Sequence, residues 1–142
     1  MHIFSLGGNQ HERIEVEVFG YERAPVGDYY DDNWLRVRVS VSAGAFSGSY
    51  DASFLTGELF GFHDQLKTLY STLRGEAVFS TLEEQLSLDL RGDGRGEIIV
   101  RGIAIDVLGD GNRLEFDLTL DQTYLQGTLE ELRRILEVFP VR

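Results

Sequence analysis

The fold of this chain is decided by the stretch Tyr29–Val41, which reads YYDDNWLRVRVSV. Its second half alternates apolar and polar residues, with Leu35, Val37, Val39 and Val41 separated by Arg36, Arg38 and Ser40. A period of two is typical of a β-strand with one apolar and one polar face. The stretch also holds the only Trp of the chain, and a turn rich in carboxylates leads into it. We therefore expect a strand near the middle of an antiparallel sheet.

The same alternation marks further strands along the chain. In the clearest one, Ile14, Val16 and Val18 alternate with Glu15 and Glu17, and this acidic row is expected beside Arg36 and Arg38. The other expected strands are 4–6, 46–54, 77–79, 86–90, 98–107, with a bulge at Gly102, and 114–120.

Two segments have helical periodicity. The first is expected to begin with Thr56 as N-cap and to end at Gly75, and the second to begin with a capping box at Thr128–Glu131 and to stop at Pro140. Their apolar stripes predict six buried residues: Leu66, Leu69, Leu132, Ile135, Leu136 and Phe139. The sequence thus predicts an α+β fold, a single domain over residues 1–142 with a mainly antiparallel sheet and two amphipathic helices packed on it. Each half of the chain reads as strands followed by one helix.

The composition narrows the class of protein. The formal net charge is −11, from 24 Asp and Glu against 13 Lys and Arg, so the surface repels phosphate backbones and favours a basic partner. Cysteine is absent, no apolar run is long enough for a membrane helix, and the first residues lack the pattern of a secretory signal. We therefore expect a cytoplasmic protein that binds neither nucleic acid nor a membrane. Simple solubility also explains the charge.

No motif predicts catalysis, a metal or a cofactor. The run Gly92–Gly96 precedes a strand rather than a helix, so it predicts a hairpin turn and not a phosphate-binding loop. The three histidines are scattered, and no serine lies in a nucleophile elbow. The spacing of Asp28, Asp31 and Asp32 fits no calcium-binding loop. We therefore do not expect an enzyme.

The best candidate for binding is the loop that leads into the Trp strand. It combines carboxylates with aromatic side chains, and Tyr and Trp are favoured anchors at protein interfaces. The alternative is that Trp34 and one Tyr only cap the core. The residues expected to bind a partner are Asp28, Tyr29, Tyr30, Asp31, Asp32 and Trp34.

Several short blocks resemble a family of bacterial immunity proteins, the WapI type, which are encoded with wall-associated or contact-dependent toxins. These blocks are 30–35 (YDDNWL), 46–52 (FSGSYDA), 73–77 (LRGEA), 92–96 (GDGRG), 114–116 (LEF) and 121–125 (DQTYL). The resemblance spans most of the chain, from Ile14 to Pro140. It implies a protein that neutralises a cognate toxin by binding it in the cytoplasm.

Three functions remain from the sequence. The leading one is a toxin-neutralising immunity protein that buries its acidic, aromatic loop against a basic toxin domain. The alternatives are a binding module for another protein or a small ligand, and an enzyme of unrecognised type. A toxin gene beside this one favours the first, whereas a deep polar pocket with shifted pKa values favours an enzyme.

Overall fold

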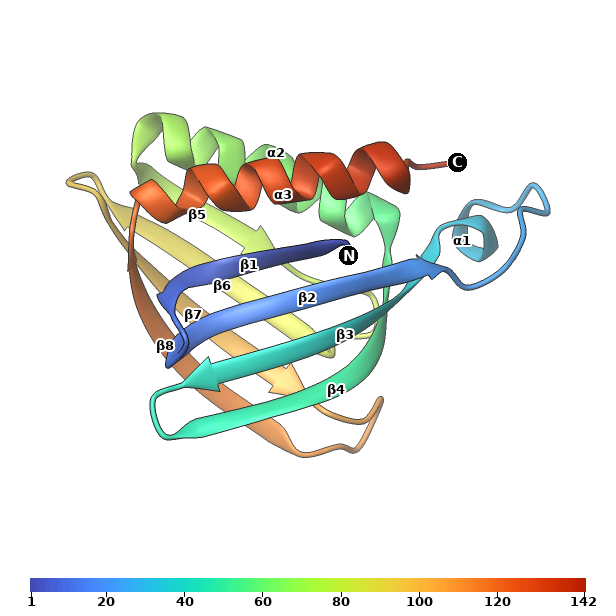
Figure 1. Ribbon diagram of the computed structural model, residues 1–142, viewed down its shortest axis with the longest axis horizontal. Helices are drawn as coiled ribbons and strands as arrows, with labels where there is room; N and C mark the ends of the chain where they lie inside the picture. Colours follow the sequence, from blue (N-terminus) through green and yellow to red (C-terminus); the bar gives the residue numbers. More distant parts are fainter.

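The computed structural model describes residues 1–142 as two four-stranded antiparallel sheets and three helices (Figure 1). The first sheet has the order β1-β2-β3-β4, and the second the order β5-β6-β7-β8. The elements are β1 (Ile3–Asn9), β2 (Glu12–Tyr21), α1 (Tyr29–Asp32), β3 (Trp34–Ala43), β4 (Phe46–Leu55), α2 (Thr56–Thr72), β5 (Arg74–Phe79), β6 (Leu86–Asp93), β7 (Glu97–Ile105), β8 (Arg113–Asp121) and α3 (Thr123–Val138). The prediction of an α+β fold with mainly antiparallel strand pairing is confirmed.

Strand β3 occupies the inner position that its sequence predicts. It pairs with β2 on one side and β4 on the other, and Glu17 lies opposite Arg38 as expected for the acidic row. Its apolar residues, from Leu35 to Val41, are buried, whereas Arg36 and Arg38 are exposed. The alternation of apolar and polar residues in this sequence therefore corresponds to the alternation of buried and exposed side chains in β3.

The eight strands form two sheets, where the sequence predicted one. Each half of the chain folds into a four-stranded meander followed by one helix, because a helix of 17 residues separates β4 from β5 and carries the chain away from the first sheet. The two sheets face each other, and α2 and α3 lie side by side along one side of the stack (Figure 1). Apolar faces of both sheets thus share one core.

Each helix covers the edge strand that begins the other half. Helix α3 lies on β1, where Thr128 donates to the Ser5 carbonyl and Glu131 Oε1 accepts from the Ser5 N–H at 3.1 Å. Helix α2 lies on β5, where the Val78 N–H donates to Gln65 Oε1 at 2.9 Å. The expected capping box is therefore wrong: α3 begins five residues earlier, and the two side chains bond the edge of a strand instead.

The ends of α2 also differ from the prediction. Leu55 is the N-cap, and its N–H donates to Glu58 Oε1 at 2.7 Å. Thr56 is already helical, and its hydroxyl donates to the carbonyl of Asn33. At the other end, the left-handed residue is Leu73, with φ of 60°, and Gly75 lies in β5. A direct helix-to-strand connection leaves no room for the later glycine cap.

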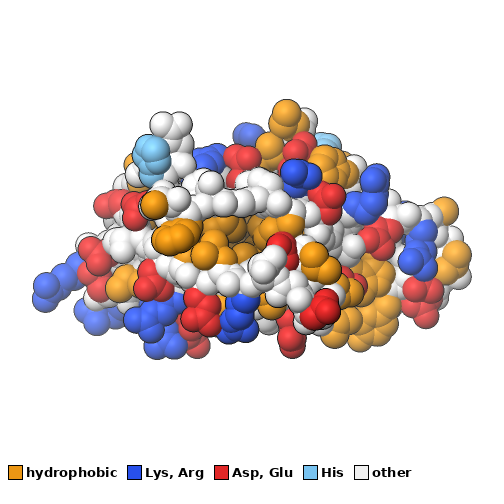
Figure 2. Space-filling model, turned by 90° about the horizontal axis from the view of Figure 1, so that it is seen from below, with side chains coloured by type: hydrophobic (Ala, Val, Ile, Leu, Met, Phe, Trp, Pro, Cys, Tyr) orange, Lys and Arg blue, Asp and Glu red, His pale blue; other side chains and the backbone are white.

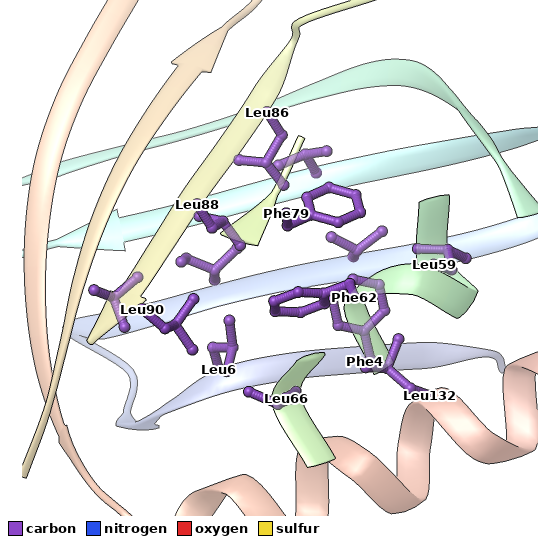
Figure 3. Close-up of a cluster of buried hydrophobic side chains, with 14 of the residues drawn as sticks. Phe4, Leu6, Leu59, Phe62, Leu66, Phe79, Leu86, Leu88, Leu90 and Leu132 are labelled. Atoms are coloured by element: carbon purple, nitrogen blue, oxygen red, sulfur yellow. The ribbon is translucent and has the colours of Figure 1, made fainter. Parts of the chain in front are cut away.

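The core is one cluster of 28 buried residues drawn from both sheets and both long helices. Figure 3 shows Phe4, Phe62 and Phe79 at its centre, with Leu66 and Leu132 entering from the helices. Four of the six residues expected to be buried are so: Leu66, Leu69, Leu132 and Ile135. The other two, Leu136 and Phe139, are partly buried against the edge of the cluster.

The two predicted turns and the predicted bulge at Gly102 can be compared with the structure. The turn predicted at 92–96 is formed by residues 94–96, since β6 extends to Asp93, and Asp110–Gly111 lies in the turn between β7 and β8, as predicted. The bulge expected at Gly102 is absent, because its pairing with Leu88 and Phe116 is regular. A Cβ at this position would lie 2.2 Å from the Phe116 ring, so glycine provides the space for that ring.

Candidate functional site

The acidic, aromatic loop leads from β2 to β3 and projects beyond the sheets (Figure 1). Residues 29–32 form the single helical turn α1, at a place where the sequence predicts a loop. Asp28 is its N-cap, and one carboxylate oxygen accepts from the Asp31 N–H at 3.0 Å. This turn gives the loop a defined shape and fixes the relative positions of Tyr29, Tyr30 and Asp31.

Asp32 holds the loop together and does not face solvent. It is only 5% exposed, and its carboxylate accepts from the N–H groups of Val26 at 2.7 Å and Gly27 at 3.0 Å. These bonds tie the start of the loop to its end. Of the three aspartates expected to bind a partner, Asp32 is therefore the one that stabilises the loop itself.

Asn33 and Arg142 anchor the loop to the C-terminal end of the chain. Asn33 is fully buried, and its side-chain amide both accepts from the Arg142 N–H and donates to the Arg142 carbonyl, each at 2.9 Å. The guanidinium of Arg142 donates to the carbonyls of Asp32 and Arg23 and lies 3.7 Å from the ring centroid of Tyr21. Sequence reasoning missed this anchor, since the partners lie more than a hundred residues apart.

Four side chains of the loop remain on the surface. Tyr29 and Tyr30 are 49% and 56% exposed, and their rings meet edge to face at 5.2 Å between centroids. Asp28 is exposed, and the half-exposed side chain of Asp31 lies 3.5 Å from the Arg23 guanidinium. Trp34 is partly buried where β3 begins. The structure thus brings together two aromatic rings and two carboxylates on one anchored projection.

Other groups that the sequence singled out lie apart from this loop. Asp93 accepts from the N–H groups of Arg95 at 2.6 Å and Glu97 at 3.1 Å in the β6–β7 turn, and these bonds hold the pKa of its carboxyl below the ordinary value. No group of three or more histidine or carboxylate side chains is placed to hold a metal ion. Each helix is too short or too polar to traverse a lipid bilayer.

The fold and the loop define an α+β protein of two facing antiparallel sheets, covered by two helices, that displays an acidic and aromatic projection. Residues 4–140 match the Immunity protein WapI-like family, and the chain belongs to this family. A comparison with curated proteins finds no match.

Proposed function

We propose that this chain is an immunity protein that neutralises a basic toxin domain by binding it, with Asp28, Tyr29, Tyr30 and Asp31 in the contact. Membership of the immunity protein family supports the toxin-neutralising role. One observation carries the choice of surface: two half-exposed tyrosines and two carboxylates share a loop anchored at both of its ends. Asp32 is buried and holds the loop, and Trp34 is partly buried at the start of β3.

The charge of the chain suits such a partner. A toxin that acts on nucleic acid needs a basic surface for the phosphate backbone, and a net charge of −11 attracts that surface from a distance. Exposed carboxylates at the rim of a contact accelerate encounter, and an aromatic ring that is desolvated at its centre prolongs the complex. The loop supplies both kinds of group.

The anchoring of the loop adds affinity without adding contacts. A flexible loop loses conformational entropy when a partner fixes it, and a loop that is already fixed avoids most of this cost. Here Asp32 holds the backbone before α1, at Val26 and Gly27, and Asn33 holds the Tyr29 carbonyl within α1. Tyr29 and Tyr30 are therefore presented in one arrangement before any partner arrives.

Binding kinetics test the proposal, with a candidate toxin domain, chosen from the genes beside this one, as the immobilised partner. The double variant Asp28→Asn with Asp31→Asn removes two negative charges and keeps an N-cap side chain that accepts the same bond. We expect slower association and a weaker dependence of the association rate on salt. Tyr30→Ala is expected to accelerate dissociation, by about tenfold for each 1.4 kcal/mol lost.

The matched control is Glu115→Gln with Asp117→Asn, which removes the same charge from the exposed face of β8. It is expected to change the association rate less than the loop variant does. Both variants weaken the long-range attraction to a basic partner, but only the loop variant removes charges from the proposed contact. Folded loop variants that bind like the wild type would place the contact elsewhere. A toxin domain that does not bind the wild-type chain at all would overturn the proposed function.

A further inference from the structure

The four edge strands of the two sheets differ in how they are covered. The edges of β1 and β5 are bonded by side chains of α3 and α2, through Ser5 and Val78. Strand β8 lies against β1, β2 and β3 of the facing sheet. Strand β4 pairs with β3, touches the start of α2 and bonds the Gln85 carbonyl through the Tyr50 hydroxyl, but no strand or helix runs along its outer edge.

The turn before β4 decides which of its backbone groups face this open edge. Ala43 pairs with Phe46 across a two-residue turn in which Gly44 has φ of 63°, so Phe46 is bonded to β3. Along an antiparallel strand, every second residue forms its backbone hydrogen bonds with the same neighbouring strand. The N–H and C=O groups of the odd-numbered residues of β4 therefore point away from β3. Leu55 confirms the parity, because its N–H reaches outward to Glu58. The outward groups belong to Ser47, Ser49, Asp51 and Ser53.

Nothing in β4 obstructs pairing with another strand. Natural edge strands are protected by lysine, proline or a bulge, and such a device is expected wherever pairing is harmful. The sequence FSGSYDASFL contains no lysine or proline, and its register with β3 is unbroken over ten residue pairs. The single charged residue, Asp51, points from the outer face and is paired with Arg38 at 3.1 Å.

A partly apolar hollow runs beside this edge, between the two sheets, and Asp106, Asn112 and Arg113 also belong to its lining. It encloses about 280 Å³ and is lined from β4 by Phe46, Gly48 and Tyr50 and from the facing sheet by Ala104 and Leu114. Figure 2 shows hydrophobic side chains on the floor of a hollow on this side of the molecule. Phe46 is 68% exposed at one end. A strand paired to β4 would place every second side chain into this hollow.

We propose that the open edge of β4 binds an extended segment of the toxin domain, which adds a fifth strand to the first sheet. This inference rests on the proposed function and places a second contact on β4, whose Phe46 end lies at the opposite end of the first sheet from the loop. The segment would carry apolar side chains toward the hollow and polar ones toward the outer face, where Asp51 is paired with Arg38. A second copy of this chain is a poorer occupant, since it would bring another net charge of −11 to the same surface.

Hydrogen exchange of single amides, followed by NMR on the full chain, tests the pairing directly. In the free protein the N–H groups of Ser47, Ser49 and Asp51 should exchange rapidly. Adding the toxin domain encoded beside this gene should slow them by about tenfold or more. Gly48 and Tyr50, whose N–H groups are bonded to β3, provide the internal reference, because they are protected in both states.

A pair of variants at one position adds a binding readout. Ser49→Pro removes an outward N–H, a change that edge strands tolerate, whereas Ser49→Ala keeps the N–H and loses only the same hydroxyl contact with Ser40. We expect Ser49→Pro to weaken binding about tenfold relative to Ser49→Ala. If Ser49→Pro does not fold, exchange in the wild-type protein decides the question.

The outcomes separate this inference from the proposed function. Binding that depends on Tyr30 but leaves the β4 amides unprotected and Ser49→Pro unaffected overturns strand addition and leaves the immunity role standing. Protection of the β4 amides that rises with the concentration of this chain alone identifies a second copy as the occupant and also overturns it. Absence of any binding overturns both.

Discussion

Asn33 and Arg142 form a reciprocal pair of hydrogen bonds that joins the binding loop to the C-terminal end of the chain. Each bond is 2.9 Å long, and Asn33 is fully buried between them. Asn33 also donates to the Tyr29 carbonyl at 2.7 Å, so one side chain fixes α1, the start of β3 and residue 142. The geometry of the loop thus depends on a residue outside the proposed contact.

Asn33→Ala is therefore expected to destabilise the protein by about 1–3 kcal/mol, because the backbone groups of Tyr29 and Arg142 lose their part-buried hydrogen bonds. It should also weaken toxin binding more than its stability loss explains, since Tyr29 and Tyr30 lose their fixed arrangement. Chemical unfolding and binding kinetics provide the two measurements. Asn112→Ala, at an exposed turn where Asn112 bonds Asp106, is the control. Equal effects of the two substitutions would show that Asn33 is no anchor.

The contact between α3 and β1 gives a second prediction. Glu131→Ala leaves the Ser5 N–H without its acceptor and should cost about 1–3 kcal/mol of unfolding free energy. Glu131→Gln keeps an acceptor oxygen and should cost clearly less. Urea unfolding of both variants provides the measurement. A Gln variant as unstable as the Ala variant would contradict the hydrogen bond as the reason.

A substitution at Leu132 tests whether α3 contributes to the core that both sheets share. It has no exposed surface, so Leu132→Ala is expected to cost about 2–5 kcal/mol by leaving a cavity. Val138→Ala removes apolar atoms from the same helix at a position that is 50% exposed and should cost much less. A denaturation midpoint that barely moves in Leu132→Ala would place this face of α3 outside the core.

The shifted pKa of the Glu58 carboxyl predicts that the stability of the protein depends on pH. Burial raises the pKa of its carboxyl above 4.5, although the N–H groups of Leu55 and Leu82 oppose the shift. The folded state thus keeps this proton to a higher pH than the unfolded chain does. Its contribution to the free energy of unfolding is therefore greatest at low pH and declines as pH rises from about 4.5 through the raised pKa.

Glu58→Gln removes this titration, so the stability of the wild type relative to the variant should decline with rising pH between about pH 4 and 7. Glu130→Gln is a control of opposite sign, because hydrogen bonding to Arg133 lowers the pKa of Glu130, so its contribution is lost as pH falls below about 4.5. Urea unfolding between about pH 3 and 7 provides the measurement. A difference between wild type and Glu58→Gln that is constant or rises with pH would contradict the assignment.

Periodicity predicted the local structure well because it reports which side chains face the core. The alternation from Leu35 to Val41 identified an inner strand, and the stripe containing Leu66 and Leu132 identified the two long helices. The number of sheets does not follow from periodicity, because the sequence pattern of an apolar face is the same whether that face packs against a helix or against another sheet. The sequence therefore predicted the strands and not their division into two sheets.

Features that depend on distant partners were the ones that sequence reasoning missed. Thr128 and Glu131 have the spacing of a capping box, but Ser5 competes for both side chains. Asp32 resembles its neighbour Asp31 in sequence, yet only Asp32 turns inward to the N–H groups of Val26 and Gly27. Composition identified the loop as a candidate contact, and the structure is needed to separate its exposed side chains from those that hold it.

Growth protection tests the central claim most directly. Cells that express the toxin domain encoded beside this gene would also express the wild-type chain, the triple variant Asp28→Asn, Asp31→Asn, Tyr30→Ala, or the control Glu115→Gln with Asp117→Asn, at matched levels of folded protein. We predict that the wild type and the control restore growth and that the triple variant does not. Full protection by the triple variant would contradict a contact through the loop, and failure of the wild type to protect would contradict the immunity function itself.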